Sequence, residues 1–409
     1  MIAAVLLSRK KLNGWLYMHI HLLGREMAIK KTIYLNQPQT QNMMKHVIAM
    51  TFVLLAATAG WSKNTIVIGA DDKEIIARAT VISNNGMILG VTDDNGHLPE
   101  ISDKDYPIII RSIGYKEQSV AEPSDTIWMA TENYNLPEIL VVSGERPITR
   151  VVSYVREYCT GATSTDTVQM FSEYMVQSFH ITQDKVKGYK KGDRRIKPLS
   201  KRQYARYANA NCDSVLIPGK DEEPFYMLSF AETISEVPAS YKEPAKIRDG
   251  FPSDTIPGKY GPKYIVSKTK DRYMVCKDAL ADYEGHRYSP WVLKMIGASM
   301  DITQVSRILF FVPNERGKYS VLDFISGAYN SHIVAKGKWL KKIFKAKEEV
   351  DMDCYVELYP VSVTFHTVSE YKELKSDKSE MPFTVNDQIP PIPPSVTSII
   401  NRLSEIGKK

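Results

Sequence analysis

The chain has 409 residues, of which 43% are hydrophobic and 24% are charged. That composition excludes an intrinsically disordered protein and leaves room for two or three domains. The formal net charge is +6, but residues 1–45 hold seven Lys or Arg against one acid, so the remaining chain is balanced. Basicity therefore gives no argument for binding nucleic acid or an anionic membrane surface.

The first recognisable segment is a basic start at Lys45, an apolar run to Ala57, and small residues at Ala57 and Ala59. This order is typical of a secretory signal peptide. We expect residues 43–59 to be that peptide and residues 1–42 to reflect a start assigned too early. A buried helix or a membrane anchor is the alternative. The run is too short for a bilayer core of about 30 Å, and no later segment predicts a transmembrane span.

Residues 64–144 consist of short apolar runs separated by turn residues, which is typical of a small antiparallel β-sandwich. Asn85-Gly86 predicts a tight hairpin, since both residues accept a positive φ. If Gly96 were the sixth residue of an EF-type calcium loop, Val91 and Ser102 would stand at its first and twelfth positions, where the loop needs acidic ligands. We therefore interpret Thr92-Asp93-Asp94-Asn95-Gly96 as a turn.

The stretches ATVISNNGMILGVTDDNGHLPEI and YPIIIRSIGYKEQSV resemble the carboxypeptidase-regulatory-like domain, although Leu98 stands where an aromatic residue is usual. The residues that carry this resemblance are Gly90, Thr92, Asp93, Asn95, Gly96, Ser112, Gly114 and Tyr115. NLPEILVVSG, at 135–144, resembles the segment that closes this domain in envelope proteins of the Bacteroides group. The resemblance covers about a fifth of the chain. It implies a seven-stranded, transthyretin-like β-sandwich over residues 60–144 that is not itself catalytic.

In many exported proteins this domain precedes the plug and barrel of a TonB-dependent receptor. A 22-strand barrel needs more than about 220 strand residues besides loops and a plug, and too little chain follows Gly144 for that.

We expect residues 150–409 to form a second, β-rich α+β domain. The stretch 167–181 alternates in places and also tolerates a helical pattern, and we favour a strand. Two apolar runs predict a hairpin over 306–325, and alternating residues predict one or two long strands over 354–371. Pro, Gly and charged residues predict loops over 218–262. Behind the extended QIPPIPP, Ser395 caps a predicted C-terminal amphipathic helix that stops at Gly407 and packs on the domain or docks a partner.

Residues 185–207 are basic, with tyrosines interleaved. This pattern can bind single-stranded nucleic acid or an anionic glycan, but a solvated hairpin is the simpler interpretation, and export argues against nucleic acid.

The four cysteines, Cys159, Cys212, Cys276 and Cys354, all follow the signal peptide. In an oxidising compartment they allow three complete pairings, and the sequence does not choose among them or exclude four buried thiols.

No catalytic or cofactor motif stands out. His97 and Glu100 have the spacing of a zinc pair but follow a turn with Pro99 between them, so we predict no metal there. Asp351 and Asp353 would share one face of a strand with no third acid, which favours solvation. We predict no metal and no cofactor.

Three functions follow, in order of preference. The first is an exported, non-catalytic protein of the periplasm or outer-membrane surface. In this protein the sandwich is a docking or spacer module, and the second domain binds an envelope partner, peptide or glycan. The second is an exported hydrolase of peptide or glycan, with acids from residues 218–290 meeting His286 and the sandwich as an accessory domain. The third is a lipid or lipoprotein carrier.

Overall fold

Short strands from residues 66–129 form two small sheets. The computed structural model describes residues 65–132, 139–140, 145–181, 185–189, 197–216, 240–258, 262–278, 298–337, 349–377 and scattered positions near the last two ranges. The first sheet has the order β3-β2-β4-β5 and the second is a parallel pair, β1-β6. Their bounds are β1 (Ile66–Gly69), β2 (Thr80–Ile82), β3 (Ile88–Val91), β4 (Ile108–Arg111), β5 (Gln118–Val120) and β6 (Thr126–Met129).

The two small sheets share one apolar core, to which Val67, Val81, Ile110 and Ile127 contribute from four different strands. The predicted hairpin at Asn85-Gly86 is present between β2 and β3, and Gly86 has a φ of 82°. We call residues 65–132 the small β-region.

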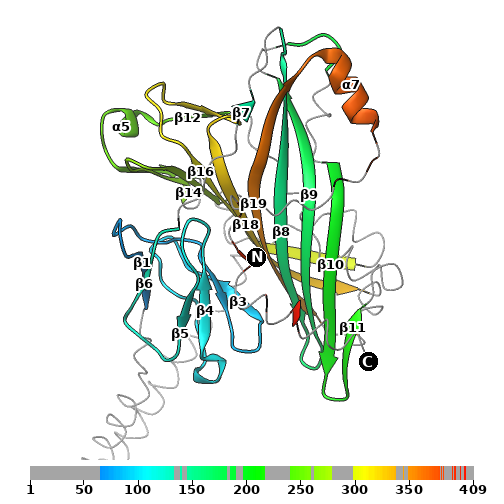
Figure 1. The fold of residues 1–409 in the computed structure, drawn as a ribbon. Coiled ribbons are helices and arrows are strands. Elements are labelled where there is room, and N and C mark those ends of the chain that lie inside the picture. The colour runs from blue at the N-terminus through cyan, green and yellow to red at the C-terminus, as the bar shows by residue number, and fades with distance from the viewer. Residues whose placement is uncertain are drawn as a thin grey trace, which may run out of the picture. The chain divides into compact units, whose positions relative to one another are not determined.

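An eleven-stranded sheet makes up most of the remaining structure (Figure 1). Its main path is β11-β10-β9-β8-β19-β18-β16-β15-β14-β13. The bounds are β8 (Ile148–Ala162), β9 (Thr167–Ile181), β10 (Lys197–Asn209), β11 (Cys212–Leu216), β13 (Ser253–Pro257), β14 (Pro262–Lys268), β15 (Tyr273–Asp278), β16 (Ala298–Phe311), β18 (Phe324–Gly337) and β19 (Val350–His366). The mainly β fold class is thereby confirmed, and β9 matches the strand predicted over 167–181.

Smaller elements lie beside this sheet. β12 (Ser240–Lys242) pairs with β17 (Lys318–Ser320), and α5 spans Ala245–Arg248. The predicted hairpin over 306–325 exists between β16 and β18, but its second strand begins only at Phe324. Pro360 is tolerated inside β19 because the register with β8 shifts there at a bulge.

Two expectations are corrected. Of the segment at 135–144, Ile139–Leu140 form β7, which pairs in parallel with Val363 and Thr364 of β19 instead of closing the small sheets. That position on β19 is open because β18 pairs with β19 only up to Leu358. The strand predicted to reach residue 371 ends at His366, and α7 (Val368–Ser376) follows, since Thr367 and Glu370 form a capping box.

Other predictions fall mostly or wholly outside the described residues. The presumed early start at 1–42 and the signal peptide at 43–59 lie outside them, as does His286. Of the predicted C-terminal helix, positions 397, 400 and 401 are described and are helical. Among the described residues, no helix is both long and apolar enough to cross a membrane.

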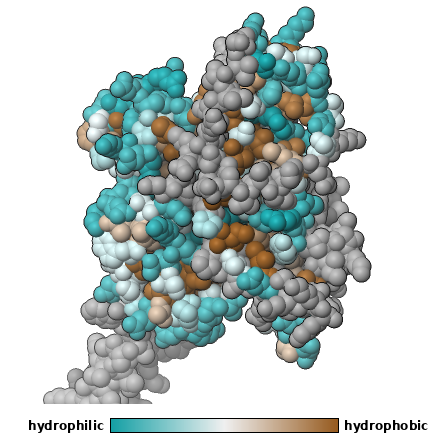
Figure 2. All heavy atoms as spheres, viewed as in Figure 1, coloured by the Kyte–Doolittle hydropathy of each residue, from teal (hydrophilic) through white to brown (hydrophobic). Residues whose placement is uncertain are grey.

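Both faces of the large sheet are buried at its centre. Successive residues of a strand point to opposite faces, so Val155, Glu157 and Cys159 share one face of β8 and Arg156 and Tyr158 the other. We call the first the cysteine face. The second is the docking face, because its apolar cluster includes Ile82, Ile88 and Ile113 of the small β-region. In the view of Figure 2 the described surface is mainly hydrophilic, interrupted by several apolar groups.

Candidate functional site

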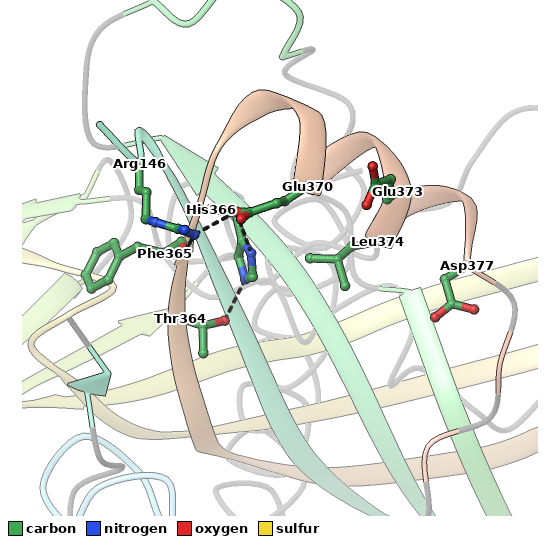
Figure 3. A pocket seen from close by; sticks show the side chains of 8 residues that line it. All are labelled: Arg146, Thr364, Phe365, His366, Glu370, Glu373, Leu374 and Asp377. Atoms are coloured by element: carbon green, nitrogen blue, oxygen red, sulfur yellow. Dashed lines mark hydrogen bonds and ion pairs between the residues drawn. The ribbon is translucent and has the colours of Figure 1, made fainter. Parts of the chain in front are cut away.

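A groove of about 580 Å³ lies where β19 turns into α7 (Figure 3). Its polar and charged lining includes one guanidinium, one imidazole and three carboxylates. The lining residues are Arg146, Thr364, Phe365, His366, Glu370, Glu373, Leu374 and Asp377. We call this cavity the α7 groove.

The capping box places the groove's central carboxylate. The backbone N–H of Glu370 donates to Thr367 Oγ1 at 3.3 Å, and the N–H of Thr367 donates to Glu370 Oε2 at 2.9 Å. Arg146 Nη1 donates to the same Oε2 at 2.7 Å and to the carbonyl of Phe365 at 3.1 Å. The Thr367 amide and then Arg146 hold the pKa of Glu370 below its ordinary value, so it is an anion at neutral pH.

His366 lies between a hydroxyl and this carboxylate. Its Nε2 is 2.8 Å from Thr364 Oγ1, and its Nδ1 is 3.5 Å from Glu370 Oε2. Burial lowers the pKa of His366 below its ordinary value, although Glu370 opposes that shift. The imidazole is therefore neutral at pH 7 and can accept a proton from a neighbouring hydroxyl.

The hydroxyl, imidazole and carboxylate stand in the order of a nucleophile, a base and the group that orients the base. The contact between His366 and Glu370 is weak, because the 3.5 Å between Nδ1 and Oε2 exceeds the normal length of a hydrogen bond. The same Glu370 oxygen already accepts from Arg146 and from Thr367 at shorter distances. The arrangement therefore works mainly as a helix cap and ion pair that stiffens one wall of the groove.

A second polar cluster joins the small β-region to the large sheet. Arg111 of β4 donates to both carboxylate oxygens of Glu357 in β19, Nε to Oε1 at 2.9 Å and Nη2 to Oε2 at 2.8 Å. Arg156 Nε of β8 donates to Glu357 Oε2 as well. The hydroxyls of Tyr355 and Tyr359 donate to the same carboxylate, at 2.7 and 3.0 Å.

The carboxylate of Glu357 is fully buried and stays charged. Burial raises its pKa, but Arg111 and Arg156 outweigh that effect and hold the pKa far below its ordinary value. The same attraction raises the pKa of Arg111 against the opposing effect of burial. A polar pocket of about 170 Å³ adjoins this cluster, between Arg111, Arg156 and Glu117.

Further contacts along the same interface involve the loop before β15. The guanidinium of Arg272 forms an ion pair with Asp72 and lies 4.7 Å and 5.3 Å from the ring centroids of Tyr115 and Phe310. Arg78 bridges Asp94 of the small β-region and Asp278 of β15, at 2.5 and 3.2 Å.

The residues of the family resemblance lie in a strand, in turns and in the core of the small β-region, and some of them reach this interface. Gly90, Gly96 and Gly114 have positive φ values of 138°, 77° and 85°. Thr92 is buried and accepts from the amide of Ala79 at 2.9 Å.

The remaining members of that set have similar structural contacts. Asp93 accepts from the amides of Asn95 and His97 at 2.9 and 2.8 Å, which is an Asx-type turn. The carbonyl of Ser112 accepts from the amide of Tyr115, whose hydroxyl donates to Asp72 at 3.1 Å.

Two of the four cysteines lie together. Cys159 of β8 and Cys354 of β19 are direct partners in the register, and their Sγ atoms are 2.8 Å apart. Cys276 is buried on the docking face, and Cys212 is exposed at the start of β11. Sequence spacing gave no sign of the pair, because the two positions are 195 residues apart.

Three described residues of the basic stretch at 185–207 are paired with acids or packed on another ring. Arg206 donates to Asp213 at 2.7 Å, Arg202 lies 3.0 Å from Glu173, and Tyr189 packs against Tyr371. Another pair that sequence reasoning missed joins His332 and Asp353 on neighbouring strands, with Nδ1 and Oδ1 2.9 Å apart.

Comparisons with known proteins assign no family. No family model matches the chain, and no curated protein does. Among solved structures, one on lipid-protein interactions in lipovitellin is similar over 62% of this chain and 28% of that chain. The sequence identity is 10% and the TM-score 0.28, a level that carries no argument about function.

Proposed function

We propose that the chain is an exported, non-catalytic protein of the cell envelope that binds a polypeptide partner in the α7 groove. In this proposal the small β-region is a docked support for the large sheet. Export is motivated by the signal-peptide pattern at residues 43–59, and the envelope by the resemblance described above.

The charge pattern of the α7 groove carries the proposal. Arg146 is engaged with Glu370, whereas Glu373 of α7 and Asp377, which follows the helix, are exposed at the groove. With His366 neutral, the lining holds three carboxylates and one guanidinium, and Lys197 and Arg150 also lie near Asp377. A positive side chain of a partner therefore meets a complementary field.

The groove also offers apolar contacts, from Phe365 and the half-buried Leu374. Partner segments that combine an apolar side chain with Lys or Arg match both features. Such grooves gain affinity from one buried apolar anchor and gain specificity from the charges at the rim.

The buried ion pair at the interface favours a structural role for the small β-region, which would hold the large sheet in place. Its Arg111 is buried against Glu357, so removing the region would leave Glu357 with one fewer cation in an apolar setting. A flexible spacer does not need such a bond. The small β-region and the sheet are accordingly tested together, by substitutions and not by deletion.

Peptide binding tests the proposal. Purified chain is measured against short peptides that pair Leu or Phe with Lys, and against matched peptides in which Glu replaces Lys. We expect the basic peptides to bind, and the double charge reversal E373K/D377K to weaken binding by about tenfold or more, equal to about 1.4 kcal/mol.

The matched control is D271K/E315K, which reverses two exposed acids outside the groove. It should leave binding unchanged. Equal binding of basic and acidic peptides, or wild-type binding by E373K/D377K, would overturn the assignment of the groove. Export is tested separately, by sequencing the N-terminus of the secreted chain, which should begin at Gly60.

A hydrolase is the second candidate, and the row Thr364, His366 and Glu370 favours it. If this row were catalytic, T364V and H366Q would each abolish turnover of ester or peptide substrates while leaving peptide binding intact. We expect no turnover above a buffer blank for the wild type. Turnover that disappears in both variants would make the hydrolase the better function.

A further inference from the structure

Cys159 and Cys354 face each other on the neighbouring strands β8 and β19, on the cysteine face. They are direct cross-strand partners, and their Sγ atoms are 2.8 Å apart. Both side chains are buried, and no other described cysteine shares this arrangement. Opposite positions on antiparallel strands bring two Cα atoms to about 4.5–5.5 Å, within the span that a disulfide bridges.

The groups around the two sulfurs oppose free thiolates in the folded chain. Glu157 lies two residues before Cys159 on the same face, and the thiol of Cys354 donates to Glu157 Oε1 at 3.4 Å. Burial raises the pKa of Cys354 to about 12 and that of Cys159 well above its ordinary value. Thiol exchange requires a thiolate, so neither sulfur reacts readily once the sheet has closed.

We propose that Cys159 and Cys354 join in a disulfide while the exported chain folds, which makes this pair a redox modification site. The thiolate of one cysteine attacks a disulfide of a thiol oxidoreductase or of an oxidised small thiol and releases one thiol. The thiolate of the other cysteine then attacks the mixed disulfide and releases the second thiol. Each cysteine loses one proton and one electron, and the oxidant's disulfide becomes two thiols.

The bond would join the two strands that carry Arg156 and Glu357, and Glu357 binds Arg111 of the small β-region. Arg156 of β8 and Glu357 of β19 are register partners three positions from Cys159 and Cys354. A covalent link at that distance fixes the strand register that brings the two charged groups together. The disulfide therefore stabilises the alignment of β8 with β19 as well as constraining the unfolded chain.

A bound metal is the competing use of the same groups. Glu157, Cys159 and Cys354 offer ligand atoms within 4.8 Å of one another. Structural zinc sites take four such ligands, and the described His, Cys, Asp and Glu residues supply only these three here. The geometry therefore favours the disulfide.

Alkylation of the wild-type chain distinguishes these states. Full-length chain exported to an oxidising compartment is denatured with a chelator and a maleimide-polyethylene glycol reagent, before and after reduction. We expect two reactive cysteines before reduction and four after it, and non-reducing peptide mapping should join the peptides that contain Cys159 and Cys354. The same chain retained in a reducing cytosol should show four reactive cysteines at once.

Single substitutions complete the test. C212S and C276S should each remove one reactive cysteine and leave the cross-link in place, whereas C159S should leave Cys354 reactive without reductant. Four reactive cysteines in the exported wild type, or a cross-link between another pair, would overturn the proposal. Stoichiometric zinc or copper in the chain before chelation, together with four reactive cysteines, would assign the cluster to a metal.

Discussion

Arg111 and Glu357 form a bidentate buried ion pair between the small β-region and the large sheet, although they lie 246 positions apart in the sequence. Arg156 and two tyrosine hydroxyls satisfy the same carboxylate. The pair therefore links the two parts of the described structure, together with the ion pairs of Arg272 with Asp72 and of Arg78 with Asp278.

We expect R111M to lower the free energy of unfolding by about 3–5 kcal/mol, because Glu357 would stay buried with less positive charge around it. Urea denaturation measures this loss. The matched control is R316A, which removes a side chain that is 72% exposed from its pair with Asp323 and should cost at most about 1 kcal/mol. Equal losses in both variants would show that the buried pair has no special role.

The pKa of Glu357 predicts how stability depends on pH. Its folded value lies far below the ordinary value of about 4.3, so at acid pH the unfolded chain binds a proton that the folded chain does not. The stabilisation is complete above the unfolded pKa and is lost as the pH falls towards the folded one. We expect E357Q to be less stable at pH 7 and to lose less stability than the wild type between pH 5 and pH 3. If the free energy of unfolding fell equally with pH in E357Q and in the wild type, this prediction would be wrong.

Two histidines should titrate on opposite sides of the ordinary value of about 6.5. The hydrogen bond and charge of Asp353 raise the pKa of His332, whereas burial lowers that of His366. The His332 pair therefore stabilises the fold fully below the unfolded pKa and loses this effect as the pH rises through the folded value. NMR titration of the imidazole signals checks both directions. D353N should lower the pKa of His332 and leave His366 unchanged.

Gly114 should be the most sensitive glycine of the interface. An added Cβ would combine a φ of 85° with a contact of 3.1 Å to the ring of Phe310. Gly250 has a similar φ of 93° but nothing within 4 Å, so G250A measures the backbone effect alone. We expect G250A to cost about 1 kcal/mol and G114A at least about 1 kcal/mol more. Thermal or urea unfolding measures both losses of stability. Equal losses in G114A and G250A would mean that the interface accommodates the added Cβ without strain.

Local patterns in the sequence determined much of the fold class. The alternation over 167–181 predicted β9, and Asn85-Gly86 predicted the turn between β2 and β3, because strand periodicity and turn chemistry act over a few residues. The boundary at His366 was missed, since an alternating pattern runs on into residues that the Thr367 capping box makes helical.

The candidate sites were decided by tertiary structure alone. The pairs Arg111 with Glu357, Cys159 with Cys354, and Arg146 with Glu370 join residues about 200 or more positions apart. Their contacts depend on which strands become neighbours and in what register, and a shift of one residue would turn every side chain to the other face. Composition and spacing do not predict the strand neighbours or their register, because both depend on the packing of the whole sheet.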